Sequence, residues 1–201
     1  AGGAGIVFPA KTIIIEEEGS FIVISPGPLN PQIIEEFKST NKNLIFIAPN
    51  NFHNLHLKTM YCLFPKAQFY GPKGSAKKSG VPLVDTKEFT SPSIEKIFIE
   101  GNEALGETCF FYKPEKKLIV TDLFFNMHHD MNLMMKMLML TAGTYKKVAT
   151  SRMIKLMTKD KSLFLKSLQK ISELDFDVAI PNHGKSISKK EFNDSLYSRI
   201  K

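Results

Sequence analysis

Two short runs of β-branched and aromatic residues open the hydrophobic pattern of the chain. Residues 12–15 and 21–24 are separated by a polar stretch that contains three glutamates and a glycine. An apolar run, a polar turn and a second apolar run predict an antiparallel hairpin. Asn30 followed by Pro31 predicts a helix start, because Asn caps a first turn and Pro fits its first position.

Strands and helices then alternate along the chain. The continuous apolar run at residues 44–48 predicts a strand buried on both faces. A helix over residues 54–64 ends before Pro65, and a short strand follows at residues 68–70. Residues 72–82 are rich in glycine, lysine and serine, and they predict a solvated loop.

The second half continues the same α/β rhythm. Ser188 and Glu191 have the spacing of a capping box and predict the start of a C-terminal helix. The remaining predicted strands and helices cover residues 97–100, 108–112, 118–121, 131–140, 162–174 and 178–180. Because no linker or repeat divides the chain, we predict one α/β domain over residues 1–201.

Composition narrows the class of protein only a little. The formal net charge is +7, but the lysines are spread along the chain, so a solvated surface explains them and nucleic-acid binding is disfavoured. Cys62 and Cys109 have no CxxC partner and lie in apolar stretches, which predicts two reduced, buried thiols. No run has the features of a signal peptide or of a membrane span, so we expect a cytoplasmic protein without membrane contact. The methionine-rich segment around residues 134–139 could serve as a homodimer face.

Three of the polar residues that could do chemistry follow predicted strands. His53 follows the strand at 44–48, Asp122 ends the strand at 118–121, and His183 follows the strand at 178–180. Ligands gather at such strand ends in α/β folds, and imidazole and carboxylate bind zinc, iron or manganese. The alternative is that these side chains only cap turns, and the residues alone leave both interpretations open.

The sequence as a whole resembles the metallo-β-lactamase superfamily, and more closely an uncharacterised branch of it. The resemblance spans residues from about Thr12 to Lys190. The matching motifs are Ile-Ser-Pro-Gly-Pro at 24–28, Ala-Pro-Asn-Asn-Phe-His at 48–53, Phe-Pro-Lys-Ala at 64–67, Leu-Ile-Val-Thr-Asp-Leu-Phe-Phe-Asn at 118–126 and Asn-His-Gly at 182–184. The superfamily implies an αββα sandwich, in which two mixed β-sheets are flanked by helices and metals lie at one edge between the sheets.

The resemblance also implies that the metal site is degenerate. In the superfamily's HxHxDH signature, Ala48 and Asn50 take the place of the first two histidines and Phe52 that of the aspartate, while His53 matches the last histidine. A further family histidine is absent near residues 101–104, where Asn102 and Glu103 are the nearest polar residues. The bridging aspartate matches Asp122 and the last ligand matches His183.

One metal position would therefore keep only Asp122, whereas the second would keep His53, Asp122 and His183. This pattern favours a single divalent metal, zinc before iron or manganese, or none at all. The fourth ligand could be His56, His128, His129 or water, and Asn50 could donate a hydrogen bond to a substrate oxyanion.

Two functional hypotheses follow from the resemblance. The first is a single-metal hydrolase acting on an ester, thioester or phosphodiester of unknown structure, with Asp122 as its catalytic residue. The second is a non-catalytic descendant that keeps the fold as a binding module. The sequence does not decide between an enzyme and a binding protein.

Overall fold

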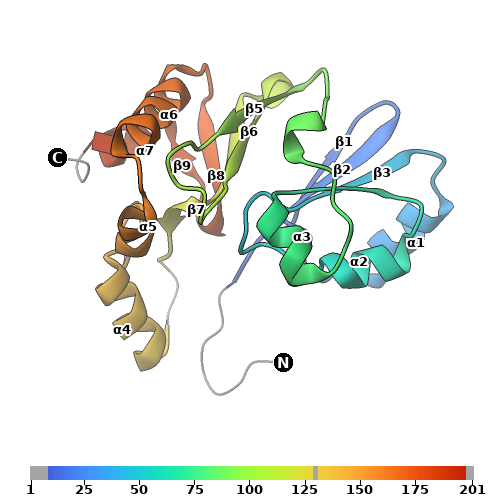
Figure 1. Cartoon of the computed structure of the whole chain (residues 1–201), viewed down its shortest axis with the longest axis horizontal. Helices are drawn as coiled ribbons and strands as arrows, with labels where there is room; N and C mark the ends of the chain where they lie inside the picture. Colours follow the sequence, from blue (N-terminus) through green and yellow to red (C-terminus); the bar gives the residue numbers. More distant parts are fainter. Residues whose placement is uncertain (1–8, 129–130, 198–201) are drawn as a thin grey trace. The chain divides into compact units, whose positions relative to one another are not determined.

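The computed structural model describes residues 9–128 and 131–197, and the chain divides into two compact units (Figure 1). The N-terminal unit is Lys11–Thr90, and the C-terminal unit runs from Ser91 onward and includes Pro9 and Ala10. The prediction of a single domain stays a prediction. Within the described residues, no helix combines the length and the apolarity that crossing a bilayer demands.

A four-stranded mixed sheet forms the frame of the N-terminal unit. Its first two strands pair antiparallel, which confirms the predicted hairpin, and the other two join in parallel. In spatial order the strands are β1 (Ile13–Glu16), β2 (Ser20–Ile24), β3 (Asn43–Ile47) and β4 (Gln68–Tyr70).

The helices of this unit include one that the sequence analysis missed. Helix α1 (Pro31–Ser39) begins as predicted, because the Asn30 side chain accepts a hydrogen bond from the Ile33 amide at 2.8 Å. Helix α2 (Leu57–Leu63) starts later than predicted. The predicted loop at residues 72–82 is wrong, because α3 (Lys73–Ser79) lies there, ended by a left-handed Gly80.

Phenylalanine rings fill the core between this sheet and its helices. Phe37 from α1 and Phe64 at the end of α2 pack edge-on against each other, with ring centroids 5.9 Å apart. Phe46 from β3 stacks on Phe69 from β4 at 5.1 Å. The buried faces of α1 and α2 therefore lie against one face of the sheet, which fixes the strand ends from which the candidate residues project.

A five-stranded mixed sheet forms the frame of the C-terminal unit. Among the described strands of this sheet only the pair β7–β8 is parallel, and the described residues between these two strands form three helices. In spatial order the strands are β5 (Ile94–Phe98), β6 (Thr108–Tyr112), β7 (Lys117–Asn126), β8 (Val178–Gly184) and β9 (Ile187–Ser188).

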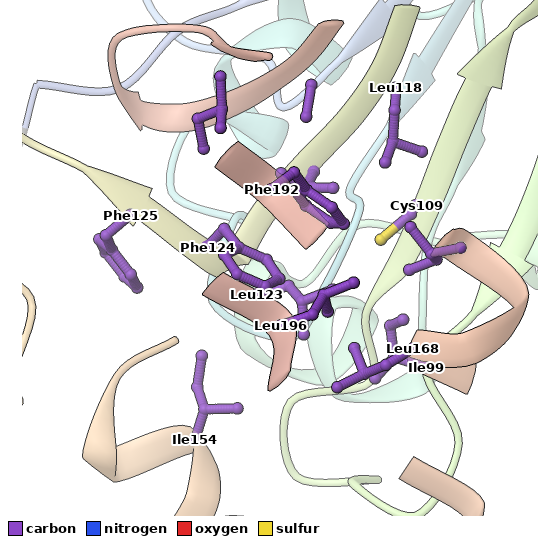
Figure 2. Packing of buried hydrophobic residues seen from close by; sticks show 14 of the residues in the cluster. Ile99, Cys109, Leu118, Leu123, Phe124, Phe125, Ile154, Leu168, Phe192 and Leu196 are labelled. Carbon is purple, nitrogen blue, oxygen red and sulfur yellow. The ribbon is translucent and has the colours of Figure 1, made fainter. Parts of the chain in front are cut away.

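The helices of this unit are α4 (Leu133–Ala142), α5 (Arg152–Met157), α6 (Lys161–Glu173) and α7 (Lys189–Tyr197). Leu168 from α6 and Phe192 from α7 join Leu118 from β7 in one buried cluster (Figure 2). The predicted capping box is confirmed, since Glu191 accepts from the Ser188 hydroxyl at 2.7 Å and donates its amide to it at 3.3 Å. Helix α5 was not predicted.

Both cysteines are free thiols, as predicted, but only one of them is buried. Cys109 lies inside the C-terminal unit, whereas Cys62 on α2 is exposed. The prediction that both are buried is therefore wrong for Cys62, which α2 places on its outer side.

Candidate functional site

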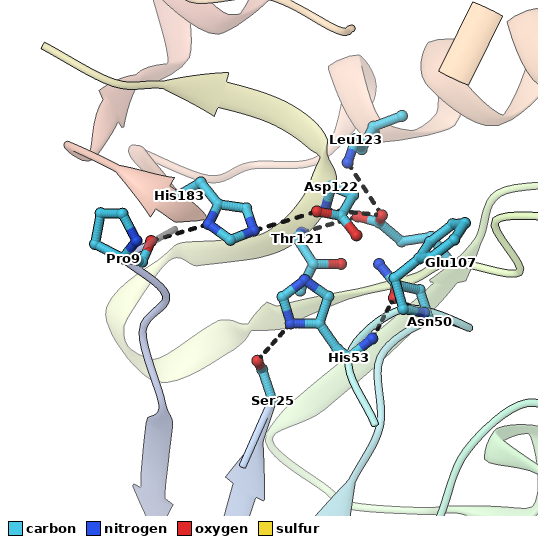
Figure 3. A network of polar contacts seen from close by, with 10 residues as sticks. Pro9, Ser25, Asn50, His53, Glu107, Thr121, Asp122, Leu123 and His183 are labelled. Carbon is cyan, nitrogen blue, oxygen red and sulfur yellow. Dashed lines mark hydrogen bonds and ion pairs between the residues drawn. The ribbon is translucent and has the colours of Figure 1, made fainter. Parts of the chain in front are cut away.

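His53 sits on a tightly organised loop that follows β3 in the N-terminal unit. The Asn50 side-chain oxygen accepts a hydrogen bond from the amide of Phe52 at 2.8 Å. It also accepts one from the amide of His53 at 3.0 Å (Figure 3). The Ser75 hydroxyl on α3 donates to the Asn50 carbonyl at 2.7 Å. Such local bonds from an Asn side chain fix a turn without regular secondary structure. Helix α3 therefore helps to hold the histidine loop.

The His53 ring is oriented by Ser25 at the end of β2. Ser25 Oγ lies 2.8 Å from Nδ1 of His53 (Figure 3). Ser25 has a φ of 56°, a conformation that residues with a side chain rarely adopt. When Nδ1–H donates to this hydroxyl, Nε2 keeps its lone pair, as a metal-binding histidine requires.

Asp122 lies in an irregularity inside β7, not at the end of a strand as predicted. The register of β7 against β8 shifts between Val120 and Phe125. The prediction ended the strand at Thr121, but β7 resumes its pairing and continues to Asn126. A bulge re-aims side chains at such a point, so Asp122 leaves the regular alternation of the strand.

Glu107 stabilises this irregularity from just before β6. Its side chain is 1% exposed, and its carboxylate accepts hydrogen bonds from the amides of Thr121, Asp122 and Leu123 at 2.8, 3.0 and 3.0 Å (Figure 3). A buried carboxylate is tolerated only with such partners. Burial first, and then the nearby Glu107 carboxylate, raise the pKa of the Cys109 thiol well above its usual value. Cys109 is therefore a protonated core residue.

His183 faces Asp122 within the C-terminal unit. Its Nδ1 lies 2.9 Å from the carbonyl oxygen of Pro9, which can only accept, so Nδ1 carries a proton. Its Nε2 lies 3.3 Å from Oδ1 of Asp122 (Figure 3). In a neutral ring this nitrogen is an acceptor that faces a carboxylate oxygen. Such an arrangement is favourable only when a proton or a cation lies between the two atoms.

The ring plane of His183 is set by stacking on its neighbour in the sheet. The Phe125 ring lies parallel to it, with centroids 5.3 Å apart and planes 4° apart. Phe125 and His183 are also register partners between β7 and β8. Pairing, stacking and the bond to Pro9 together leave His183 one orientation, with Nε2 toward Asp122.

The residues at the lost ligand positions have other tasks. Ala48 is fully buried, and so is Asn50, whose oxygen is used by the backbone of the His53 loop. We therefore assign Asn50 a positioning role in place of the predicted oxyanion contact. Phe52 is 43% exposed, and the ammonium group of Lys78 lies 4.6 Å from its ring centre. Ala48 and Asn50 therefore supply no imidazole where the family has two histidines of the first metal position, and Phe52 supplies no carboxylate where it has the signature aspartate of the second.

The turn near residues 101–104 has a structural role, because Asn102 connects it to α5. The Asn102 amide donates to the Ile154 carbonyl at 3.0 Å and to Thr158 Oγ1 at 3.1 Å, and its oxygen accepts from the Leu105 amide. Asn102 is fully buried and ties this turn to α5, while Glu103 is exposed. Neither replaces the missing histidine in the described structure.

The candidates for a fourth ligand differ in their placement. His56 occupies the N-cap position of α2 without a side-chain capping bond. His128 is exposed just after β7, and His129 lies outside the described residues. The identity of the fourth ligand stays open among these residues and water.

Sequence reasoning found the three candidate ligands but missed two residues that orient them. Ser25 belongs to the Ile-Ser-Pro-Gly-Pro motif at 24–28, and its position after a predicted strand did not indicate that it would contact His53. Glu107 is an acidic residue directly before the apolar strand at 108–112, a signal that fits any loop. The structure places His53 in one unit, and Asp122 and His183 together in the other.

Solved structures of metallo-β-lactamase fold proteins are similar to this chain. The metallo-β-lactamase from Pontibacter korlensis is 12% identical with a TM-score of 0.61, over 99% of this chain and 92% of that one. FIM-1 from Pseudomonas aeruginosa, in a mono-zinc form, is 13% identical with a TM-score of 0.61, over 92% and 81%. The chemotaxis sensor ODP, as a peroxy diiron species, is 14% identical with a TM-score of 0.60, over 98% and 91%.

No protein-family model matches the chain, and no curated protein sequence matches it significantly. The structural matches therefore establish the fold alone. The chain has the metallo-β-lactamase fold with two mixed sheets flanked by helices, as the sequence analysis predicted.

Proposed function

We propose that this protein is a single-metal hydrolase in which His53, Asp122 and His183 hold one divalent cation. The observation that carries the proposal is the pair Asp122 and His183, whose facing oxygen and nitrogen are 3.3 Å apart. Two ligands on a tetrahedral zinc, each bound at about 2.0–2.1 Å, lie roughly 3.3 Å apart. The pair therefore has the spacing of two ligands of one ion.

The chemistry of the donor set fits a metal as well. Nδ1 of His183 is hydrogen-bonded to the Pro9 carbonyl oxygen, and Nδ1 of His53 is within hydrogen-bonding distance of Ser25 Oγ. Metal-ligating histidines characteristically bond their second nitrogen in this way, which fixes the tautomer and the ring plane. Two imidazoles and one carboxylate suit zinc, and they also suit iron or manganese.

In the proposed reaction the substrate is an ester, thioester or phosphodiester. A bound divalent cation supplies Lewis acidity toward a carbonyl or phosphoryl oxygen and increases the acidity of water. Asp122 has two carboxylate oxygens, of which Oδ1 faces His183. We assign the carboxylate the further role of taking the proton from the attacking water. Glu107 keeps the backbone of Asp122 fixed while this happens.

Proteins of the same fold support the choice of metal. FIM-1 is known in a mono-zinc form, and ODP is known as a diiron species. A single ion in this fold therefore has a structural precedent, and zinc and iron are the first metals to test.

The free thiols are compatible with the cytoplasmic location that we propose.

The test is the metal content of protein purified without chelator, measured by mass spectrometry. We expect about one zinc, iron or manganese per chain. His183→Ala and His53→Ala should both lose it, while Lys190→Ala, an exposed control on α7, should keep it. His183 is buried and its variant can unfold, so the half-buried His53 carries the test in that case. Full metal content in a folded His53 variant would overturn the proposal.

A binding module without catalysis is the second candidate. It is favoured by Ala48, Asn50 and Phe52, which provide a buried methyl group, a structural amide and an exposed ring where the family has metal ligands. In this case metal-supplemented protein stays metal-free, and His183→Ala changes only the free energy of unfolding. Stoichiometric metal together with hydrolysis of a model ester or phosphodiester would exclude it.

A further inference from the structure

Helices α4 and α5 carry an unusual concentration of exposed apolar side chains. Of the fourteen large hydrophobic residues that are exposed in the described structure, seven lie on these two helices. Of these seven, Leu156 and Leu133 are the most exposed, at 87% and 75%. The seven residues are Leu133, Met134, Met137, Leu138, Leu140, Met153 and Leu156, which we call the α4–α5 surface.

The core does not account for these side chains. Met135 and Met139 on α4 and Ile154 on α5 already point into the buried cluster of the C-terminal unit. The Arg152 guanidinium donates to the Thr141 carbonyl at 3.3 Å and ties α5 to the end of α4. The opposite faces of both helices therefore point outward. A surface helix normally carries charged and polar residues there, but α4 has only Lys136 and Thr141.

The charges that residues 131–159 contribute to the α4–α5 surface have one sign. Between Asp130 and Asp160 the sequence contains no acidic residue. The same stretch has six basic residues, which are Lys136, Lys146, Lys147, Arg152, Lys155 and Lys159. All of them are exposed except Lys155, which is half-buried. Exposed apolar side chains accompanied by these cations match the surface of an anionic bilayer, where acyl chains lie beneath negatively charged headgroups.

We propose that the α4–α5 surface docks the protein on an anionic lipid bilayer. The leucine and methionine side chains enter the boundary between headgroups and acyl chains, and the lysines and Arg152 contact the anionic headgroups. The contact is peripheral, because neither helix has the length to cross a bilayer. This inference replaces our expectation that no membrane is involved, and it is independent of the metal.

A second copy of the chain fits the same surface less well. Two copies meeting through it would bring together the basic residues of two 131–159 segments, neither of which contains an acidic residue. Like charges at close range oppose such a dimer, whereas an anionic bilayer attracts both the charges and the apolar side chains. The homodimer is therefore the competing outcome of the test.

The experiment is co-sedimentation of the full chain with vesicles of phosphatidylcholine containing about one third phosphatidylserine, compared with pure phosphatidylcholine. Met137→Gln combined with Leu140→Gln should weaken binding by about tenfold or more, because it removes apolar contact without changing charge. The matched control is Leu163→Gln combined with Leu165→Gln, which alters two exposed leucines on α6. All four residues are exposed, so the variants keep the fold.

The charge requirement is tested in the same assay. Lys136→Gln combined with Lys147→Gln should weaken binding to the anionic vesicles by about tenfold. Lys166→Gln combined with Lys190→Gln removes the same charge from α6 and α7 and should leave binding unchanged. Absence of binding to anionic vesicles, or equal binding by the Met137/Leu140 variant, overturns the proposal. A dimer in solution that this variant abolishes, without vesicle binding, assigns the surface to a second copy.

Discussion

The carboxylate of Glu107 accepts a hydrogen bond from the backbone amide of Asp122 at 3.0 Å, at the point where β7 departs from its regular pairing. The same carboxylate accepts from the amides on both sides of Asp122. A bulge in a strand leaves amides without their ladder partners. Here the buried Glu107 side chain supplies the missing acceptors. These hydrogen bonds hold the backbone at Asp122, the candidate metal ligand, in place.

This relationship predicts the effect of Glu107→Gln. The substitution keeps the shape but leaves one acceptor oxygen for three amides, and its new amide group would face donors. A buried donor left without an acceptor costs about 1–3 kcal/mol, so we expect the free energy of unfolding to fall by that amount. Denaturant unfolding measures it. Glu35→Gln, at an exposed ion pair on α1, is the control and should change stability by less than about 0.5 kcal/mol. Equal stability of the Glu107 variant would contradict the assigned role.

The elements that the sequence predicted correctly carry their signals locally. The hairpin β1–β2 follows from two β-branched runs around a polar turn, and α1 follows from Asn30 and Pro31. The capping box of α7 needs only Ser188 and Glu191. In each case the residues that determine the structure are within a few positions of one another. Local propensity and tertiary structure agree there.

The features that the sequence analysis missed depend on residues distant in the chain. The bulge at Asp122 exists because Glu107, fifteen positions earlier, accepts its amide. Helix α3 looked like a loop because of its glycine, lysine and serine content, but Ser75 is buried and its hydroxyl binds the Asn50 carbonyl. Strand periodicity and composition do not indicate which distant side chain will hydrogen-bond a given backbone group. Hence the candidate ligands could be predicted from motifs, whereas the residues that position them could not.

Ser25→Ala should weaken metal binding without removing the site. The alanine takes away the oxygen 2.8 Å from Nδ1 of His53 while all three proposed ligands remain. Loss of an outer partner of a ligating histidine typically lowers metal affinity by about 10–100-fold. Competition titration against a chromogenic chelator measures this change. Ser39→Ala, at an exposed serine of α1, is the control. If both variants bound metal as tightly as the parent protein, Ser25 would not orient a metal-binding His53.

Gly184→Ala should destabilise the C-terminal unit severely. Gly184 has a φ of 102°, and a Cβ placed there would lie 2.0 Å from the Asn126 carbonyl oxygen and 2.3 Å from its carbonyl carbon. Both contacts are with backbone, so β7 and β8 would have to separate next to His183. We expect a loss of about 3 kcal/mol or more in the free energy of unfolding.

Thermal and denaturant unfolding would measure the effect of Gly184→Ala. The matched control is Gly19→Ala in the β1–β2 turn, where a Cβ would meet nothing within 4 Å. This control should change stability by less than about 1 kcal/mol. Similar unfolding of the two variants would show that β7 and β8 do not approach each other as closely as the structure places them.

The capping box of α7 predicts a pH-dependent contribution to stability. Hydrogen bonds from the Ser188 hydroxyl, and then from its amide, lower the pKa of Glu191 below its ordinary value of 4.5. A carboxyl whose pKa is lower in the folded state stabilises that state at any pH above its unfolded pKa. The contribution is lost as the pH falls from about 4.5 through the folded pKa.

Glu191→Gln keeps a hydrogen-bond acceptor but does not titrate. The stability difference between the parent protein and this variant, measured by denaturant unfolding from pH 7 downward, should therefore be constant at first and shrink in acid. A difference that grows on acidification would reverse the sign of the linkage and show that Glu191 is not held by Ser188.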